Sequence, residues 1–100
     1  MKKYYVYILA NHYNNVLYTG VTGFLEKRVY QHKNGKGGFF TKKYKCHKLV
    51  YFNETDCISA AIGYEKKIKA GSRHKKDELI KEENPHWLDL SDGWFEDNQK

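Results

Sequence analysis

No apolar run in the sequence approaches the roughly 20 residues that a membrane-spanning helix needs, so we expect no membrane association. The two cysteines, Cys46 and Cys57, have neither CxxC spacing nor zinc-ligand companions. We therefore expect two reduced thiols packed as small apolar groups. The first residues, 1–3, lack the apolar region and small-residue cleavage site of a signal peptide. These absences favour a cytoplasmic protein.

Acidic residues are absent from residues 27–48, in a chain whose formal net charge is +6. A basic segment of one sign is typical of surfaces that bind phosphate-rich polymers, although it can also be a solubilising surface. Glycines and aromatic residues lie between the lysines, which favours nucleic acid. The expected contacts are Lys27, Lys33, Lys36, Lys42, Lys43 and Lys45.

The length of 100 residues, 40% of them hydrophobic, is sufficient for one domain with a modest core. We expect this domain to occupy residues 1–90. The acidic residues 91–100 are expected to form a flexible tail, with the alternative that Trp94 and Phe95 dock on the domain.

The stretch Tyr4–Gly20 organises the rest of the chain. Two runs rich in β-branched and aromatic residues, 4–9 and 16–19, flank an Asn-rich segment at 11–15. Asparagine tolerates the conformations that a turn requires. The pattern therefore predicts an antiparallel hairpin, in which Tyr7 and Tyr18 can lie on the same side of the sheet.

After the hairpin, the sequence predicts a helix, a loop, a strand and two further helices. Leu49–Phe52 reads as a third strand of the same sheet, and the expected fold is α/β (α+β), a three-stranded antiparallel sheet flanked by three helices. The other expected elements are a helix at 24–33, a flexible basic loop at 36–47, a helix at 57–70 capped by Asp56, and a helix at 73–83 capped by Ser72. In the loop, Phe39, Phe40 and Tyr44 could stack on bases or fold onto the core.

Helical spacing places several polar residues at defined positions. Arg28 and His32 are four residues apart and share one face. Glu65 falls within an apolar stripe formed by Ile58, Ala61, Ile62 and Ile68. An unpaired buried carboxylate is costly, so Glu65 is expected at the rim of a cleft facing a cation. The alternative is an exposed Glu65 paired with Lys69.

The hairpin motifs resemble those of a known superfamily. Tyr-Val-Tyr at 5–7 and Tyr-Thr-Gly at 18–20 are similar to the paired motif of the GIY-YIG nucleases. The first glycine and both central isoleucines are replaced, whereas Tyr7, Tyr18 and Gly20 are kept. The Asn-Pro-x-Trp-x-Asp-Leu ending resembles the small stand-alone bacterial group of this superfamily.

The resemblance extends through the later elements in order. GIY-YIG domains follow the hairpin with a helix arginine, matched by Arg28, and many have a histidine four residues later, matched by His32. A metal-binding glutamate on a later helix is matched by Glu65, and a late asparagine by Asn84. The resemblance therefore implies a GIY-YIG-like fold over residues 4–90.

The resemblance also implies a mechanism, metal-dependent endonucleolytic cleavage of DNA. The implied catalytic residues are Tyr7, Tyr18, Arg28, His32, Glu65 and Asn84. In such a site Glu65 holds Mg²⁺ or Mn²⁺ beside the phosphate, and Arg28 directs donors to the developing charge. Tyr7 activates water with help from His32, and Tyr18 positions the water or the phosphate. The expected substrate is DNA, or alternatively RNA, selected by structure rather than sequence, as in repair or recombination.

Each candidate also has a structural interpretation. Tyr7 and Tyr18 can be core aromatics, Arg28 and His32 an ordinary exposed helix face, and Asn84 a helix cap. The alternative function is a nucleic-acid-binding module without useful catalysis. Its main support is a departure from the family motif, since residue 5 is a tyrosine where the motif has glycine. A protein-interaction domain has little support beside the basic segment.

Overall fold

A three-stranded antiparallel sheet with strand order β2–β1–β3 forms the centre of the fold. The computed structural model describes residues 2–95, so residues 1 and 96–100 lie outside the described part. The elements in chain order are β1 (Tyr4–Ala10), β2 (Leu17–Thr22), α1 (Leu25–Lys33), α2 (Phe39–Tyr44), β3 (Lys48–Thr55), α3 (Ile58–Ala70) and α4 (Arg73–Glu83). The predicted hairpin and the third antiparallel strand are confirmed.

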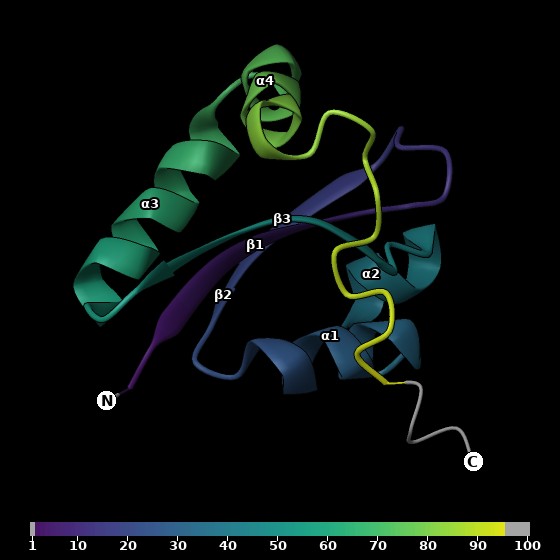
Figure 1. Cartoon of the computed structure of the whole chain (residues 1–100), viewed down its shortest axis with the longest axis horizontal. Coiled ribbons are helices and arrows are strands. Elements are labelled where there is room, and N and C mark those ends of the chain that lie inside the picture. The colour runs from purple at the N-terminus through teal and green to yellow at the C-terminus, as the bar shows by residue number, and fades with distance from the viewer. Residues whose placement is uncertain (1, 96–100) are drawn as a thin grey trace.

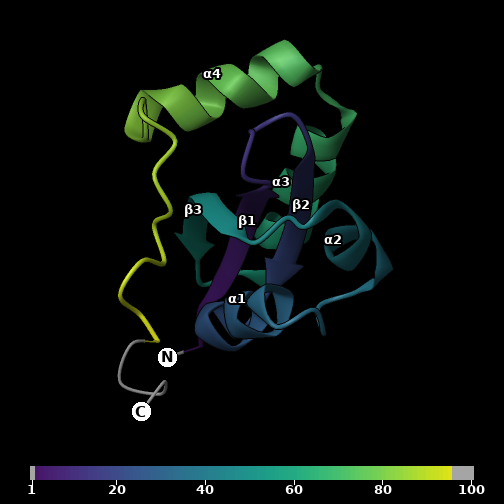
Figure 2. The same ribbon diagram turned by 90° about the vertical axis from the view of Figure 1, so that its right-hand side faces the viewer.

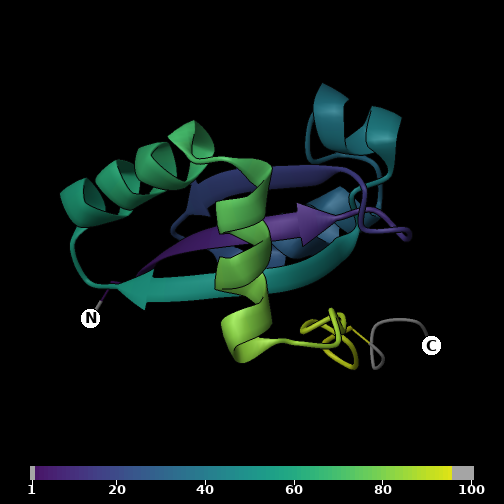
Figure 3. The ribbon, with the colours of Figure 1, turned by 90° about the horizontal axis from the view of Figure 1, so that it is seen from above.

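The two faces of the sheet carry separate cores because alternate side chains of β1 point in opposite directions. Val6, Ile8 and Ala10 pack against α3 and α4, whereas Tyr7 and Leu9 pack toward α1. Figure 1 shows α3 and α4 on one side of the sheet and α1 and α2 on the other. In Figure 3, α4 crosses above the strands. Within residues 2–95, none of the helices combines the length and apolarity needed to cross a membrane.

A register shift between Ile8 and Leu9 lets β3 supply both cores. Ile8 pairs with Tyr51 and Leu9 with Leu49, which leaves Val50 as the extra residue. Such a bulge interrupts the strict alternation of side chains. Val50 and Tyr51 therefore join the core under α3 and α4, and Leu49 joins the core under α1.

The helix at 73–83 has the predicted bounds, and Ser72 caps it by accepting a hydrogen bond from the Lys75 amide at 3.2 Å. The helix at 24–33 is also confirmed, one residue shorter at its start. The predicted cap at Asp56 is wrong, because the Cys57 backbone occupies the N-cap position and its amide donates to Thr55 Oγ1 at 3.2 Å.

The predicted loop at 36–47 is also wrong, because it contains the short helix α2. Only Thr41 is buried among the six residues of this helix, which leaves no apolar stripe for sequence analysis to detect. The sheet thus has four helices around it in the described part, one more than expected.

The predicted apolar stripe of α3 is partly wrong. Ile58 and Ile62 are exposed, and the buried residues of the helix are Ala61 and Ile68. The two cysteines also differ. Cys46 is buried in the core under α1, as expected, but Cys57 is exposed.

The chain after α4 returns along the sheet to α1, as Figure 2 shows. Asp89 anchors this return by accepting hydrogen bonds from Lys33 Nζ at 2.6 Å, Ser91 Oγ at 2.6 Å and the Leu49 amide at 3.2 Å. Trp94 and Phe95 then pack on the core under α1, which is the docking alternative for these residues. A domain boundary at residue 90 stays a prediction, and part of the tail, 96–100, lies outside the described residues.

Candidate active site

A chain of hydrogen bonds runs from the first strand through α1 to α2. The Tyr7 hydroxyl lies 3.1 Å from Nε2 of His32, and Nδ1 of His32 lies 2.9 Å from Oγ1 of Thr41. The Thr41 hydroxyl is 3.4 Å from the Gly38 carbonyl, to which it donates. Tyr7 and His32 are 1% and 0% exposed, so water does not compete for these bonds.

The partners of Thr41 and Tyr7 favour one tautomer of His32. The Thr41 proton is directed to a carbonyl, so Thr41 Oγ1 accepts from Nδ1–H of His32. In the neutral ring Nε2 then carries the lone pair, and the Tyr7 hydroxyl donates to it. His32 is thus placed to accept the proton of Tyr7.

Two glycines make room for this pair. Gly20 is the partner of Tyr7 across the hairpin, and a Cβ at Gly20 would lie 2.6 Å from both Cζ and the hydroxyl of Tyr7. A Cβ at Gly37 would lie 2.0 Å from Nδ1 of His32. Both glycines are therefore required by close approach. Gly20 belongs to the recognised motif, whereas the role of Gly37 and Thr41 was missed by sequence analysis.

Charges near the Tyr7 hydroxyl come from two other elements. Burial raises the pKa of Tyr7 to about 12, and the nearby Tyr18 and Glu65 add to this, while Arg28 opposes it. Burial, together with the positive charge of Arg28, lowers the pKa of His32 to about 4. Arg28 and Glu65 therefore have opposite effects on the pKa of the Tyr7 hydroxyl.

Arg28 is held by α1 and by the following loop. Its guanidinium donates to Gln31 Oε1 at 2.9 Å and to the Gly37 carbonyl at 3.0 Å. Neither partner is charged, and within residues 2–95 no ion pair cancels the positive charge of Arg28. The side chain is half-buried and lies beside His32 on the shared helix face.

The structure gives Glu65 part of each predicted role, a largely buried carboxylate and a partner of Lys69. Its side chain is only 12% exposed, and it also pairs with Lys69 Nζ at 2.6 Å. Within residues 2–95 no three His, Cys, Asp or Glu side chains gather into a metal cluster. A single carboxylate does not suit Zn²⁺, which needs three or four protein ligands. It does suit Mg²⁺, which keeps several waters and binds through one or two carboxylates plus phosphate oxygens.

The structure brings Tyr7, Tyr18 and His32 together, with ring centroids of Tyr18 and His32 5.6 Å apart. Asn84 differs. Its side-chain amide donates to the carbonyls of Val50 and Leu88 at 3.1 and 2.9 Å, and its oxygen accepts from the Leu88 amide at 3.0 Å. This geometry supports the helix-cap alternative for Asn84.

The lysines predicted to contact nucleic acid also divide into two kinds. The exposed ones are Lys27, Lys36, Lys42, Lys43 and Lys45. Lys33 instead donates to Asp89 at 2.6 Å and to the His47 carbonyl at 2.9 Å, so it holds the C-terminal segment in place. Three further cations, Lys69, Arg73 and Lys76, line a groove beside Tyr18 that sequence analysis missed, because they come from two helices.

Tyr5, which replaces the first glycine of the motif, lies at the α1 side of the sheet. Its ring packs edge-on against Phe52, with centroids 6.4 Å apart. Tyr5 pairs with Thr22 and Glu54 in the sheet. The substitution thus adds an aromatic ring to the core under α1.

Comparison with known proteins agrees with this geometry. The model of the GIY-YIG catalytic domain matches residues 3–78. UPF0213 proteins from Staphylococcus saprophyticus and Syntrophus aciditrophicus are 42% and 43% identical, over 82% and 85% of this chain and 99% and 97% of theirs. The solution NMR structure of a UPF0213 protein from Bacillus halodurans is 27% identical, has a TM-score of 0.57, and covers 91% of this chain and 97% of its own. The chain therefore belongs to the GIY-YIG family, among the UPF0213 proteins.

Proposed function

We propose that this protein is an endonuclease that cleaves DNA phosphodiester bonds with a divalent metal ion, Mg²⁺ or Mn²⁺. The observation that carries this proposal is the buried bond from Tyr7 to His32, with the charges of Arg28 and Glu65 acting on the same hydroxyl. These groups come from β1, α1 and α3. No local pattern requires them to meet, so their convergence supports a catalytic site.

Tyr7 and His32 would act together on the attacking water. Tyr7 passes its proton to Nε2 of His32 and takes a proton from the water, whose oxygen bonds to phosphorus as the bond to the leaving oxygen breaks. The pKa values of about 12 and about 4 oppose this transfer in the free protein. Positive charge near Tyr7 favours its ionised form, so the transfer depends on the cations gathered around the bound phosphate.

Arg28 and Glu65 would handle the charge of the phosphate. The Arg28 guanidinium offers directed donors where negative charge develops. Glu65 would hold the divalent ion, which supplies Lewis-acid stabilisation of the phosphate and the leaving oxygen when it is bound. Tyr18, half-exposed on β2, would position the phosphate or the water.

We further propose cleavage of branched or nicked DNA, of the kind that arises in repair or recombination in the cytoplasm. The exposed lysines of the basic segment are suited to phosphates, which carry no sequence information. RNA is the alternative substrate. A binding module without catalysis is a second candidate, favoured by the near-complete burial of Tyr7 and by the pairing of Glu65 with Lys69.

A cleavage assay separates these candidates. The purified protein is incubated with Mg²⁺ or Mn²⁺ on nicked, branched, single-stranded and blunt duplex DNA. Tyr7→Phe should lower the rate at least about 10²-fold, the lower end for loss of general acid–base catalysis. Tyr13→Phe, in the exposed hairpin turn, is purified identically as the control and should cleave normally. Binding without cleavage would favour the binding module, whereas equal cleavage by Tyr7→Phe would remove Tyr7 from the mechanism.

A further inference from the structure

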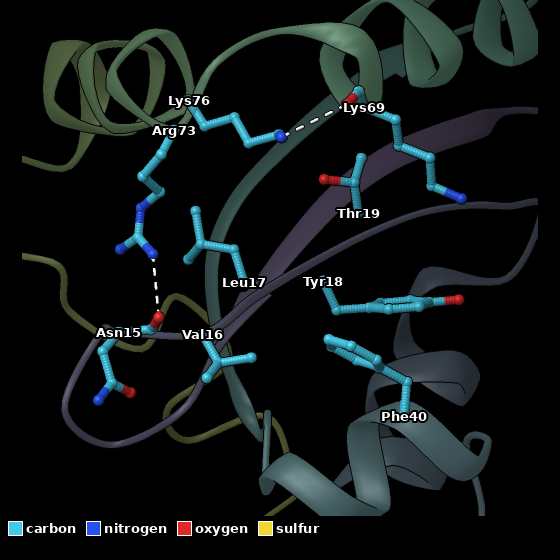
Figure 4. Close-up of a pocket in the computed structure, with 9 residues that line it drawn as sticks. All are labelled: Asn15, Val16, Leu17, Tyr18, Thr19, Phe40, Lys69, Arg73 and Lys76. Carbon is cyan, nitrogen blue, oxygen red and sulfur yellow. Dashed lines mark hydrogen bonds between the residues drawn. The ribbon is translucent and has the colours of Figure 1, made fainter.

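An open groove lies along the outer edge of β2, beside the candidate active site (Figure 4). Its volume of about 480 Å³ lies within the roughly 300–1,000 Å³ of small-ligand sites. One wall is aromatic, formed by Tyr18 of β2 and Phe40 of α2. The other is cationic, formed by Lys69, Arg73 and Lys76 of α3 and α4. Among the described residues that line it, none is acidic.

The cationic wall is held in place by backbone contacts. Lys76 Nζ donates to the carbonyls of Gly71 at 3.0 Å and Lys69 at 3.5 Å, which are neutral and leave its charge in place. Arg73 donates to the Asn15 carbonyl at 3.1 Å and pairs with Asp77 at 2.7 Å. Arg73 thus ties α4 to the hairpin turn, and Lys76 contributes the least compensated charge.

The aromatic wall presents rings in a row. The centroids of Tyr18 and Phe40 are 6.0 Å apart, with 34° between the ring planes, and Phe40 lies 4.7 Å from Tyr44. Figure 4 shows the rings of Tyr18 and Phe40 one above the other. Phe40 as a whole residue is 41% exposed, so part of it is accessible from the groove. Exposed rings beside cations are the combination by which proteins bind unpaired nucleic acid.

The groove leads directly into the candidate site. Tyr18 belongs to both, and Lys69 of the cationic wall pairs with Glu65 at 2.6 Å. A strand held in the groove would therefore pass beside the carboxylate that we propose to hold the metal ion. The groove thus bears on which part of a DNA substrate reaches the catalytic residues.

We propose that this groove binds an unpaired strand of DNA, with a base stacked on Phe40 and phosphates held by Lys69 and Lys76. In a duplex the base faces are covered by neighbouring base pairs, so only an unpaired base can use the Phe40 ring. The inference rests on the proposed nuclease function and specifies its substrate as DNA with a single-stranded segment beside the cleavage point.

Binding in the absence of divalent metal tests the groove separately from cleavage. Fluorescence anisotropy compares a duplex carrying a single-stranded DNA overhang with the blunt duplex, in EDTA. The wild type should prefer the overhang by about 5-fold or more, the scale of roughly 1–3 kcal/mol for stacking one base. Phe40→Leu should abolish this preference, because leucine keeps apolar bulk without a ring face. Phe39→Leu, its neighbour on α2, is 81% exposed outside the groove and should keep the preference.

Two further measurements test the groove even if the Phe40→Leu variant does not fold. A 2-aminopurine in the overhang should change its fluorescence on binding to the wild type and to Phe39→Leu. Lys76→Gln should weaken overhang binding and lower the salt slope by about one, whereas Lys75→Gln, outside the groove, should not.

Equal binding of blunt and overhang DNA by the wild type would overturn the groove proposal, as would equal effects of the two phenylalanine variants. Preference for an RNA overhang over a DNA overhang would also overturn it. Selective overhang binding without any cleavage in Mg²⁺ would leave the groove assignment standing and contradict only the nuclease proposal.

Discussion

The Tyr7 hydroxyl lies within hydrogen-bond distance of Nε2 of His32, at 3.1 Å, and both side chains are buried from solvent. The imidazole is neutral there because burial and Arg28 lower its pKa to about 4. An unfolded chain would have a histidine pKa near 6.5. The unfolded state therefore binds more protons than the folded state between these two values.

The first prediction concerns the dependence of stability on pH. The depressed pKa of His32 contributes stability that is present above about pH 6.5 and is lost as pH falls toward about 4. His32→Gln should lower the free energy of unfolding at pH 7, and this difference from the wild type should shrink by pH 4.5. Urea unfolding at both values measures it. His12→Gln, at an exposed turn position, is the control and should follow the wild type at both pH values.

The second prediction concerns the close approach of Gly20 to Tyr7. Gly20→Ala would place a Cβ 2.6 Å from the Tyr7 hydroxyl, which must then move. The expected cost is about 1–3 kcal/mol of stability, together with most of the cleavage activity. Gly63→Ala on α3 is a matched control, since its Cβ would meet no atom within 4 Å. This control should gain up to about 1 kcal/mol from helix propensity. Normal activity in Gly20→Ala would contradict the role of Tyr7.

The third prediction concerns Arg28. Arg28→Ala should lower the cleavage rate at least about 10²-fold, the scale of losing one transition-state donor, with little loss of DNA affinity. Lys27→Ala, the exposed neighbour on α1, should affect affinity slightly and rate hardly at all. In Tyr7→Phe/Arg28→Ala the loss should be much smaller than the product of the single losses, because residues acting as a unit are non-additive. If the loss of rate in the double variant equals the product of the two single losses, Tyr7 and Arg28 act independently.

The fourth prediction concerns the metal ligand. Glu65→Gln should abolish cleavage and weaken Mn²⁺ binding measured by titration calorimetry in the presence of DNA. The fold should remain, because its partner Lys69 is 53% exposed and can turn to water. Glu78→Gln, an exposed carboxylate of α4, is the control and should bind Mn²⁺ and cleave normally. Wild-type cleavage by Glu65→Gln at limiting Mg²⁺ would remove Glu65 from the mechanism.

The fifth prediction separates lysines that bind DNA from a lysine that holds the fold. Neutralising the exposed Lys42, Lys43 and Lys45 should weaken DNA binding and flatten its salt dependence, because fewer counterions are released. Lys33→Ala should lower the melting temperature instead, because it leaves Asp89 without its charged partner. DNA affinity that does not change between low and moderate salt would show that the basic segment is not the DNA surface.

The sequence by itself determined the elements whose signals are local. The hairpin followed from two β-rich runs around an asparagine-rich turn, and the helix at 73–83 followed from the Ser72 cap and its periodicity. Helical spacing also placed Arg28 and His32 on one face. The motif around Tyr7 and Gly20 indicated the family, because these residue types are fixed by chemistry and by close approach.

Only the tertiary structure decided what surrounds those residues. The short helix α2 has no apolar stripe, and it brings Thr41 to His32 of the preceding helix. Lys33 binds Asp89, which is 56 residues later in the chain, and so leaves the predicted DNA surface. Hydrogen bonds and charge effects depend on distance in space, whereas sequence patterns report only neighbours along one helix or strand. The sequence therefore specified the residue types of the candidate site, and packing decided their protonation, their partners and the groove beside them.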